Sequence, residues 1–440
     1  MDPGLASRHM EPWLTRAARV HGTRTALRTS DGAETTYAEL HARAREVAST
    51  LHAQRVAPGD HVALALPSAE LVVALHACLL LGAVAVPIDL RLTEAEQAVR
   101  AAHASVVLDT LPTDTDSGGA AAVRGPRTID PDATATLMFT SGTTAGPKPV
   151  ALSYDNWLWN ALGSALALGL DPEETWLCPM PLAHVGGLSI QIRSAVYGTT
   201  VLLHERYDTE LALDALMDAE QRVTLVSLVP TMLSRLLDAG LQAPPTLRRV
   251  LLGGGPIAPA LLARARDAGV AVSPSYGMTE ACSQIATDGM PLLGTELEIA
   301  PDGEILVRGR TVAAGALGPD GWLHTGDLGA LDDAGRLVIA GRKADTIVTG
   351  GENVAPVEVE SVLLEHPGVV DAAVFGRLDP EWGEAVVAQV VLADGAALEP
   401  EVLRTYCASR LAPFKVPKRF EPVSGIPRGV TGKLLRRELR

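Results

Sequence analysis

Residues 140–149 read Thr-Ser-Gly-Thr-Thr-Ala-Gly-Pro-Lys-Pro and combine hydroxyls, glycines and one lysine. Glycines let backbone N–H groups approach anionic oxygens, hydroxyls donate hydrogen bonds, and lysine adds a point charge. The composition therefore suits an oligophosphate, with a flexible polar loop as the alternative. It does not match the phosphate-binding pattern G-x-x-x-x-G-K-[S/T]. The candidate phosphate-binding residues are Thr140, Ser141, Gly142, Thr143, Thr144, Gly146 and Lys148.

A second polar segment, SYGMTE (275–280), follows the apolar run GVAVSPS, which we predict to be a strand. Ligands of parallel sheets bind beyond the carboxyl ends of the strands. Tyr276 is placed to stack on a base, and Thr279 to bond a phosphate oxygen. Glu280 suits Mg²⁺, which prefers carboxylate and phosphate oxygens. The alternative for Glu280 is an acidic residue that favours a helix N-terminus.

The C-terminal tail is basic, although the whole chain carries a net charge of -15. Between residues 415 and 440 its basic residues are Lys415, Lys418, Arg419, Arg428, Lys433, Arg436, Arg437 and Arg440. Such a concentration indicates an anionic ligand for at least one of them. We expect Lys433, which follows Thr-Gly, to be functional, and Arg436, Arg437 and Arg440 to be solvated surface residues.

Five segments together resemble the ordered signatures of the adenylate-forming superfamily, which includes acyl-CoA ligases, nonribosomal adenylation domains and luciferases. Besides the two polar segments above, they are HTGDL (324–328), GRKADTIVTGGENV (341–354) and GVTGKLLRR (429–437). The resemblance extends over the chain from about residue 11.

This resemblance implies a nucleotide site for ATP and Mg²⁺. Asp327 would accept hydrogen bonds from the ribose hydroxyls, and Arg342 would be a second ribose or phosphate contact. Glu280 would hold the Mg²⁺, and Lys433 would contact the acyl carboxylate and the α-phosphate. The other nucleotide-binding candidates are Gly253, Gly254, Gly255, Pro256, Ser275, Tyr276, Gly277, Met278 and Thr279.

The implied reaction forms an acyl-adenylate and then a thioester with coenzyme A. In the superfamily, the C-terminal domain rotates about a hinge between the two steps. Gly350 and Gly351 would then flank the pantetheine tunnel, because glycines leave room for a thin ligand. Many relatives carry Asp or Lys two residues after the hinge arginine. Here that position is Ala344, so the sequence leaves the pivot residue open.

The segment PMPLAHVGGLSIQIRSAVYGTTVLLHE (179–205) most resembles o-succinylbenzoate–CoA ligases of menaquinone biosynthesis. Arg193 stands in an apolar predicted helix, and a buried arginine requires an anion, such as a second carboxylate of the acid. The alternative is a surface arginine whose stem alone is buried. His184 corresponds to the family's gate between acyl pocket and thiol tunnel. Ser283, Gln284 and Thr287 are further candidate pocket residues.

Other functions stay open at this point. An aryl or fatty acid–CoA ligase, or an enzyme that loads a carrier protein, would share the same motifs. A catalytically inactive nucleotide-binding protein is disfavoured, because Lys433, Glu280, Asp327 and Arg342 are all present.

The pattern of apolar runs predicts the helices and strands that position these residues. It indicates an α/β fold with layered, mostly parallel sheets. Apolar runs at 61–66, 82–88, 105–109, 199–204, 223–229, 248–254 and 269–277 alternate with stretches of helical length. From about residue 294 the pattern changes to hairpins, which predicts a small β-barrel-like part. We expect an N-terminal domain at 11–341, a hinge at 342–346, and a small mobile α+β domain at 347–440.

Composition narrows the function classes further. The net charge argues against nucleic-acid binding, which needs basic surface to displace counterions. The apolar run from Leu71 to Ile88 approaches the length of a membrane span, but Gly82 and Pro87 favour a core helix followed by a strand. Cys78, Cys178, Cys282 and Cys407 show no metal or disulfide spacing, and the N-terminus shows no signal-peptide pattern. We therefore expect a cytoplasmic protein, and leave a homodimer open.

Overall fold

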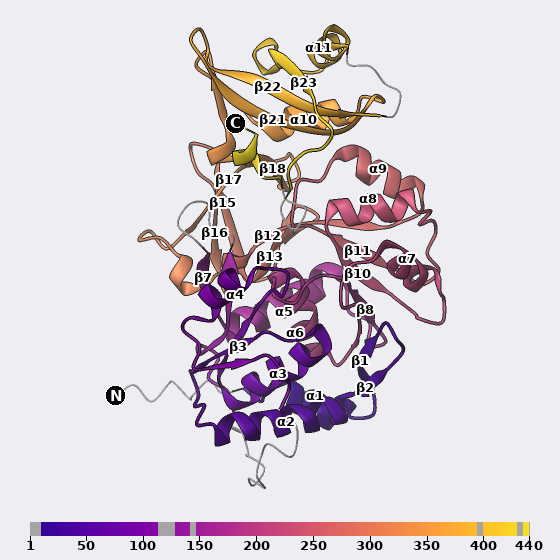
Figure 1. The fold of residues 1–440 in the computed structure, drawn as a ribbon, viewed down its shortest axis with the longest axis vertical. Helices are drawn as coiled ribbons and strands as arrows, with labels where there is room; N and C mark the ends of the chain where they lie inside the picture. The colour runs from indigo at the N-terminus through magenta and orange to yellow at the C-terminus, as the bar shows by residue number, and fades with distance from the viewer. Residues whose placement is uncertain (1–9, 113–127, 141–146, 394–398, 429–433, 440) are drawn as a thin grey trace.

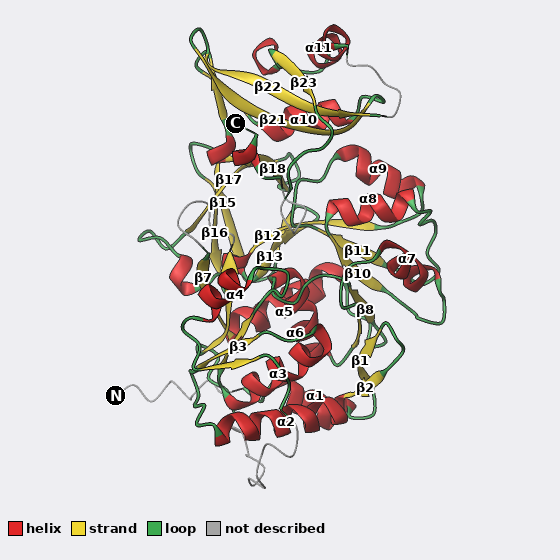
Figure 2. Ribbon diagram, viewed as in Figure 1, coloured by secondary structure: helices red, strands yellow, loops and turns green. Residues whose placement is uncertain are grey.

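The computed structural model describes residues 10–112, 128–140, 147–393, 399–428 and 434–439 (Figure 1). It confirms an α/β architecture with two largely parallel sheets, a smaller antiparallel sheet and a C-terminal α+β unit. Figure 2 shows how helices and strands alternate in the larger part of the molecule.

The first sheet carries the stems of the candidate phosphate loop. Its described strands run in the order β5 (Val106–Leu108), β3 (His61–Leu64), β4 (Val84–Pro87), β6 (Thr134–Thr140) and β7 (Lys148–Ser153). β7 is antiparallel to β6, and the other pairs are parallel.

Helix α4 (Glu94–Ala101) begins with a capping box in which Thr93 and Glu96 satisfy each other's backbone N–H groups.

The second sheet is larger and is parallel in its centre. Its described strands are, in order, β14 (Met290–Pro291), β13 (Ser283–Thr287), β12 (Val272–Met278), β11 (Arg249–Leu252), β10 (Leu225–Leu228), β8 (Thr175–Cys178), β9 (Thr200–Leu203), β1 (Thr25–Thr29) and β2 (Glu34–Thr36). Only β2, β13 and β14, at the two edges, pair antiparallel to their neighbours within the described ranges.

Successive residues of the central strands contribute to two different cores because strand side chains alternate between faces. Trp176 and Cys178 pack into one core with helices α1 (Trp13–His21), α2 (Tyr37–Ala53), α3 (Ser68–Leu81), α5 (Tyr154–Leu168) and α6 (Val185–Tyr197). Leu177 packs on the other face with α7 (Thr209–Met217), α8 (Pro230–Asp238) and α9 (Pro259–Asp267). Helices therefore cover both faces of this sheet.

The apolar run Leu71–Ile88 is a buried helix and strand, as predicted. Helix α3 ends at Gly82, whose φ of +78° is the left-handed conformation that glycine tolerates best. Its backbone N–H caps the carbonyl of Cys78, and β4 follows at once. No helix within the described ranges is long and apolar enough to cross a membrane.

The predicted hairpins form an antiparallel sheet of β15 (Thr295–Ile299), β16 (Glu304–Gly309), β17 (Leu323–Leu331) and β18 (Leu337–Arg342). Beyond it lies the C-terminal unit, at the top of Figure 1. This unit contains β19 (Ile347–Thr349), β20 (Glu352–Val354), α10 (Pro356–Leu364), β21 (Val369–Asp379), β22 (Gly383–Leu392), α11 (Pro400–Ala408) and β23 (Arg419–Pro422). Its sheet and its helices enclose a core of their own, which includes Val374, Val386 and Phe420.

The expectation that Arg436 is a solvated surface residue is wrong. Its side chain is only 13% exposed, donates to Glu360 Oε2 at 2.8 Å, and reaches Asp345 Oδ2 at 3.1 Å. Burial alone would lower the pKa of Arg436, but the two carboxylates outweigh it and raise this pKa. Periodicity could not reveal this, because the partners lie about 76 and 91 positions away in the chain. The side chains of Arg437 and Arg440 lie outside the described residues.

Removing this arginine should destabilise the C-terminal unit. We expect Arg436→Met to lower the free energy of unfolding by about 3 kcal/mol or more, because the buried Glu360 carboxylate loses its main partner. Urea unfolding followed by circular dichroism measures this difference.

The double variant Arg436→Met/Glu360→Gln is the matched control, since it removes both charges together. It should recover much of the lost stability. If the single variant unfolds at the same urea concentration as the unchanged protein, the buried ion pair is not a major support of this unit.

Candidate active site

The ends of the predicted phosphate loop face each other across a hairpin. Thr140 ends β6 and pairs with Lys148, the first residue of β7, whose side chain is exposed. Both residues therefore lie at the end of the β6–β7 pair where the loop joins the two strands. Ser141, Gly142, Thr143, Thr144 and Gly146 lie outside the described residues, so their predicted phosphate contacts stay predictions.

Asp327 lies at the centre of the candidate ribose site. Its carboxylate is buried, accepts a hydrogen bond from the Tyr276 hydroxyl at 2.8 Å and forms an ion pair with Arg342 Nε at 2.9 Å. Burial and the neighbouring carboxylate both raise the pKa of Tyr276, so its hydroxyl stays a donor at neutral pH. The three residues come from β12, β17 and β18. The structure thus brings together residues 51 and 15 positions apart, as the sequence motifs suggested.

A tight reversal of the chain places SYGMTE beside the candidate pocket residues. β13 folds back on β12, and a Cβ on Gly277 would lie 1.6 Å from the Ser283 carbonyl oxygen. Only glycine fits there. Cys282 and Ser283, with φ of 54° and 90°, hold the left-handed conformation that non-glycine residues adopt at a cost. Gly253 similarly packs closely on Ser275, where a Cβ would lie 2.8 Å from its carbonyl oxygen.

Glu280 carries a carboxylate that no described residue engages. It lies in the short 3₁₀ helix Thr279–Ala281, half-buried, without a hydrogen bond or ion pair from its side chain to the described chain. No cluster of three or more His, Cys, Asp or Glu side chains in the described ranges is suited to a metal ion. A single free carboxylate fits Mg²⁺ that arrives with ATP, since such an ion takes most of its ligands from phosphate and water.

His184 stands at the start of α6 beside two residues that the sequence analysis missed. Its Nε2 lies 3.4 Å from Asp89 Oδ2, and Arg91 Nη2 donates to the same oxygen at 2.6 Å. Burial opposes ionisation of Asp89, but hydrogen bonds from Arg91 and His184 outweigh it and lower the pKa of Asp89. The available signal was the pair of polar residues in PIDLR directly after β4.

Arg193 is buried rather than exposed, so the alternative of a surface arginine is wrong. Its side chain is 1% exposed, and its Nε and Nη2 donate to Asn160 Oδ1 at 3.1 and 2.6 Å. Its guanidinium also lies 5.5 Å from the ring centre of Trp176. Burial lowers the pKa of Arg193 to about 10, so it remains charged at neutral pH. No carboxylate in the described part of the chain pairs with it.

Other polar groups are buried around α5, α6 and β13. Gln284 Nε2 donates to Thr287 Oγ1 at 2.7 Å, and both side chains are buried. Gln284 Oε1 and Asn160 Nδ2 have no hydrogen-bond partner among the described residues. Buried polar atoms are normally satisfied, so these two suit a polar ligand group.

The predicted residues do not form a single cluster. His184 and Arg193 lie nine residues apart on one helix, about 14 Å of helix rise, so they occupy opposite ends of any shared pocket. Gly350 and Gly351 lie in the turn between β19 and β20, and Gly350 packs against the Trp382 ring. Lys433 lies outside the described residues.

Family comparisons agree with this arrangement. Residues 14–317 match the family "AMP-binding enzyme", and residues 358–433 match "AMP-binding enzyme C-terminal domain". The chain therefore belongs to the AMP-binding enzyme family.

Individual relatives narrow the class. The 2-succinylbenzoate–CoA ligase of Bacillus subtilis is 38% identical, and the match covers 97% of each chain. A structure of o-succinylbenzoate CoA synthetase (MenE) from Bacillus subtilis with the acyl-adenylate OSB-AMP has a TM-score of 0.89 at 37% identity, over 98% of each chain. The same enzyme with ATP and magnesium ion has a TM-score of 0.88 at 37% identity, over 98% of this chain and 99% of its own.

Asp327 provides the test of the nucleotide site. We expect Asp327→Asn to raise the KM for ATP tenfold or more, because hydrogen bonds to a charged acceptor contribute about 1.5–3 kcal/mol. The KM for the acid should stay unchanged. Tyr276→Phe is the matched control, since it removes one donor to Asp327 but leaves the carboxylate. Equal increases in both KM values for Asp327→Asn would contradict a specific ribose role.

Proposed function

We propose that the protein is an ATP-dependent o-succinylbenzoate–CoA ligase of menaquinone biosynthesis. The observation that carries the proposal is the buried Arg193, which has no acidic partner in the described chain, within the fold of the AMP-binding enzymes. o-Succinylbenzoate has a second carboxylate that is not activated, and this group would supply the missing anion. The near full-length match to 2-succinylbenzoate–CoA ligases supports the same substrate.

In the first half-reaction, the acid's carboxylate attacks the α-phosphate of ATP and expels pyrophosphate. Charge develops on phosphoryl oxygens, so the protein acts mainly by positioning and electrostatic stabilisation. Asp327 and Arg342 hold the ribose, and the loop from Thr140 to Lys148 holds the β- and γ-phosphates. Lys433 contacts the α-phosphate. Glu280 would hold Mg²⁺, which neutralises phosphate charge when bound.

In the second half-reaction, the thiol of coenzyme A attacks the acyl carbon of the adenylate and releases AMP. The thiol must approach from another direction, so the C-terminal domain rotates about the hinge at 342–346. His184 would gate the route between acyl pocket and thiol. Gly350 and Gly351 would line the pantetheine tunnel.

The contacts around the hinge favour Ala344 as its pivot. Lys343 Nζ reaches Asp302 at 2.7 Å and Glu304 at 3.0 Å, so it is tied to the antiparallel sheet. Asp345 is tied to the C-terminal unit through Arg436. Ala344 alone stands between these two anchors, so a change of its backbone dihedrals would break neither ion pair. This supports a domain boundary at residues 342–346.

Three further points belong to the proposal. A cytoplasmic location agrees with four free, buried cysteines. An aryl or fatty acid, or a carrier-protein thiol, remains the alternative substrate. A homodimer stays a prediction that sedimentation would test.

Pyrophosphate release with and without CoA tests the function directly. The panel is o-succinylbenzoate, benzoate, 4-coumarate and octanoate, with ATP and Mg²⁺. We expect CoA-dependent turnover with o-succinylbenzoate only, and none from a Lys433→Ala control. Turnover with another acid would refute the substrate, and silence with every acid would refute the ligase assignment within this panel.

The role of Arg193 requires a matched pair of substrates. We expect Arg193→Met to raise the KM for o-succinylbenzoate about 30-fold or more, because the buried carboxylate loses its charged partner. The analogue in which hydrogen replaces the unactivated carboxylate should show little change. The KM for ATP and the thermal unfolding midpoint show whether the substitution disturbs the structure as a whole. Equal effects on both acids would remove Arg193 from the pocket.

A further inference from the structure

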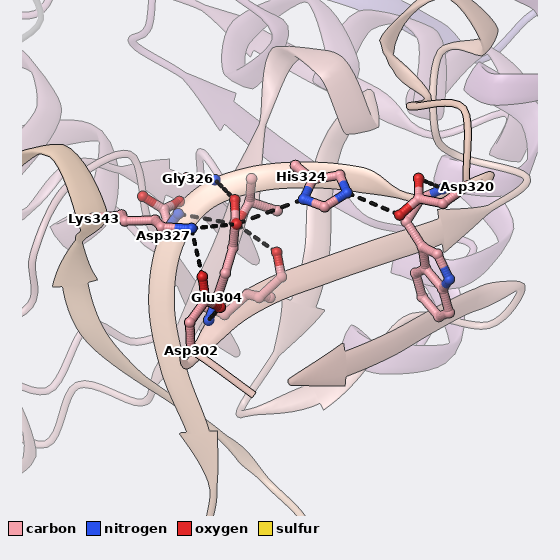
Figure 3. Close-up of polar contacts among 10 residues, drawn as sticks. Asp302, Glu304, Asp320, His324, Gly326, Asp327 and Lys343 are labelled. Carbon is pink, nitrogen blue, oxygen red and sulfur yellow. Dashed lines mark hydrogen bonds and ion pairs between the residues drawn. The ribbon is translucent and has the colours of Figure 1, made fainter. Parts of the chain in front are cut away.

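Glu304 is a buried carboxylate at the first position of β16, between the candidate ribose site and the hinge (Figure 3). None of the predicted catalytic or binding roles includes it. Its two oxygens bond different parts of the chain, and this division is the basis of the inference.

One oxygen supports the ribose site. Glu304 Oε1 accepts the backbone N–H of Gly326 at 2.9 Å, directly before Asp327. Gly326 has a φ of +69° and lies within β17, where the ladder to β16 is irregular, so the strand is locally distorted just before Asp327. Thr325 adds a second support, because its hydroxyl donates to the Ile305 carbonyl at 2.7 Å and accepts the Asp327 N–H at 3.1 Å. Strand β16 thus supports the irregular part of β17 that presents Asp327.

The other oxygen supports the hinge. Glu304 Oε2 accepts from Lys343 Nζ at 3.0 Å and lies 3.5 Å from His324 Nδ1. Lys343 begins the short 3₁₀ helix Lys343–Asp345 and immediately precedes Ala344. Asp302 also binds this lysine, but its side chain is 54% exposed, whereas that of Glu304 is 10% exposed. Both carboxylates raise the pKa of Lys343, Asp302 by the shorter contact and Glu304 from the less exposed position, and only Glu304 also bonds the chain next to Asp327.

Glu304 remains charged in this setting. Burial opposes its ionisation, but the hydrogen bonds from Lys343 and the Gly326 N–H outweigh burial and lower the pKa of Glu304. On the other side, Asp320 and Glu304 together raise the pKa of His324. Lys343 is the main cationic partner, because it lies at 3.0 Å from Glu304, whereas the imidazole lies at 3.5 Å.

We propose that Glu304 is a positioning residue that couples the ribose-binding part of β17 at Asp327 to the hinge at Lys343. The inference rests on the proposed function, in which Asp327 binds ribose and the hinge allows domain rotation. Glu304 keeps Lys343 attached to the antiparallel sheet while the C-terminal domain turns, and it holds Asp327 in place during both half-reactions.

The two halves of this role can be separated by substitution. In Glu304→Gln, the amide oxygen can still accept the Gly326 N–H, while the amide nitrogen faces Lys343 and cannot accept its hydrogen bond. Lys343→Met removes the hinge contact from the other side. Glu304→Ala removes both contacts. Glu298→Gln is the control, because Glu298 is exposed on neighbouring β15 and bonds no described residue through its side chain.

The half-reactions are measured separately, by ATP–pyrophosphate exchange and by single-turnover transfer of pre-formed acyl-adenylate to CoA. We expect Glu304→Gln and Lys343→Met to leave the KM for ATP within about twofold but to slow transfer about fivefold or more. Glu304→Ala should also raise the KM for ATP about fivefold. Equal effects of Gln and Ala on both half-reactions, or transfer at the unchanged rate in both Glu304→Gln and Lys343→Met, would overturn the coupling.

Two readouts do not depend on turnover. Calorimetry should show weaker AMP binding for Glu304→Ala than for Glu304→Gln, and trypsin should cut after Arg342 or Lys343 faster in Glu304→Gln than in Glu298→Gln. If the unchanged protein activates no acid, the proposed function fails while these two comparisons still decide the coupling. Equal binding and equal cleavage would overturn it.

Discussion

The arrangement of the candidate active site depends on the contacts of one buried carboxylate, that of Asp327. It accepts a hydrogen bond from the Tyr276 hydroxyl on β12 and forms an ion pair with Arg342, the last residue of β18. A buried charge is costly unless it is paired, so these contacts constrain each other. The proposed nucleotide site, the antiparallel sheet and the proposed hinge consequently meet at one side chain.

The antiparallel sheet links the two chemical regions of the protein. Its strand β17 presents Asp327, and β18 leads directly into the hinge. Strand β17 is held in place by backbone hydrogen bonds to β16 on one side and to β18 on the other. The proposed hinge, by contrast, has only the short 3₁₀ helix Lys343–Asp345, whose first residue pairs with Glu304 and whose last pairs with Arg436. Motion is therefore expected where the regular pairing ends.

The predicted acid pocket depends on buried polar groups rather than on a paired carboxylate. Arg193, Asn160 and Gln284 are buried polar groups whose hydrogen-bonding capacity is incompletely used within the described chain. A site of this kind favours a ligand that completes the hydrogen bonds, and penalises one that leaves them unpaired. Specificity for an acid with a second carboxylate would then come from the cost of leaving a buried arginine alone.

The sequence by itself determined the fold class and many of the strands, and it supplied the motifs whose nucleotide-binding roles stay predictions. Alternation and apolar runs depend on local spacing, and the runs at 61–66, 82–88 and 248–254 became β3, β4 and β11. The tertiary structure decided which charges pair. Arg436 in the tail, Asp89 beside His184 and Glu304 between two sites all depend on partners distant in sequence. Such contacts form only when the chain closes on itself, so no local pattern encodes them.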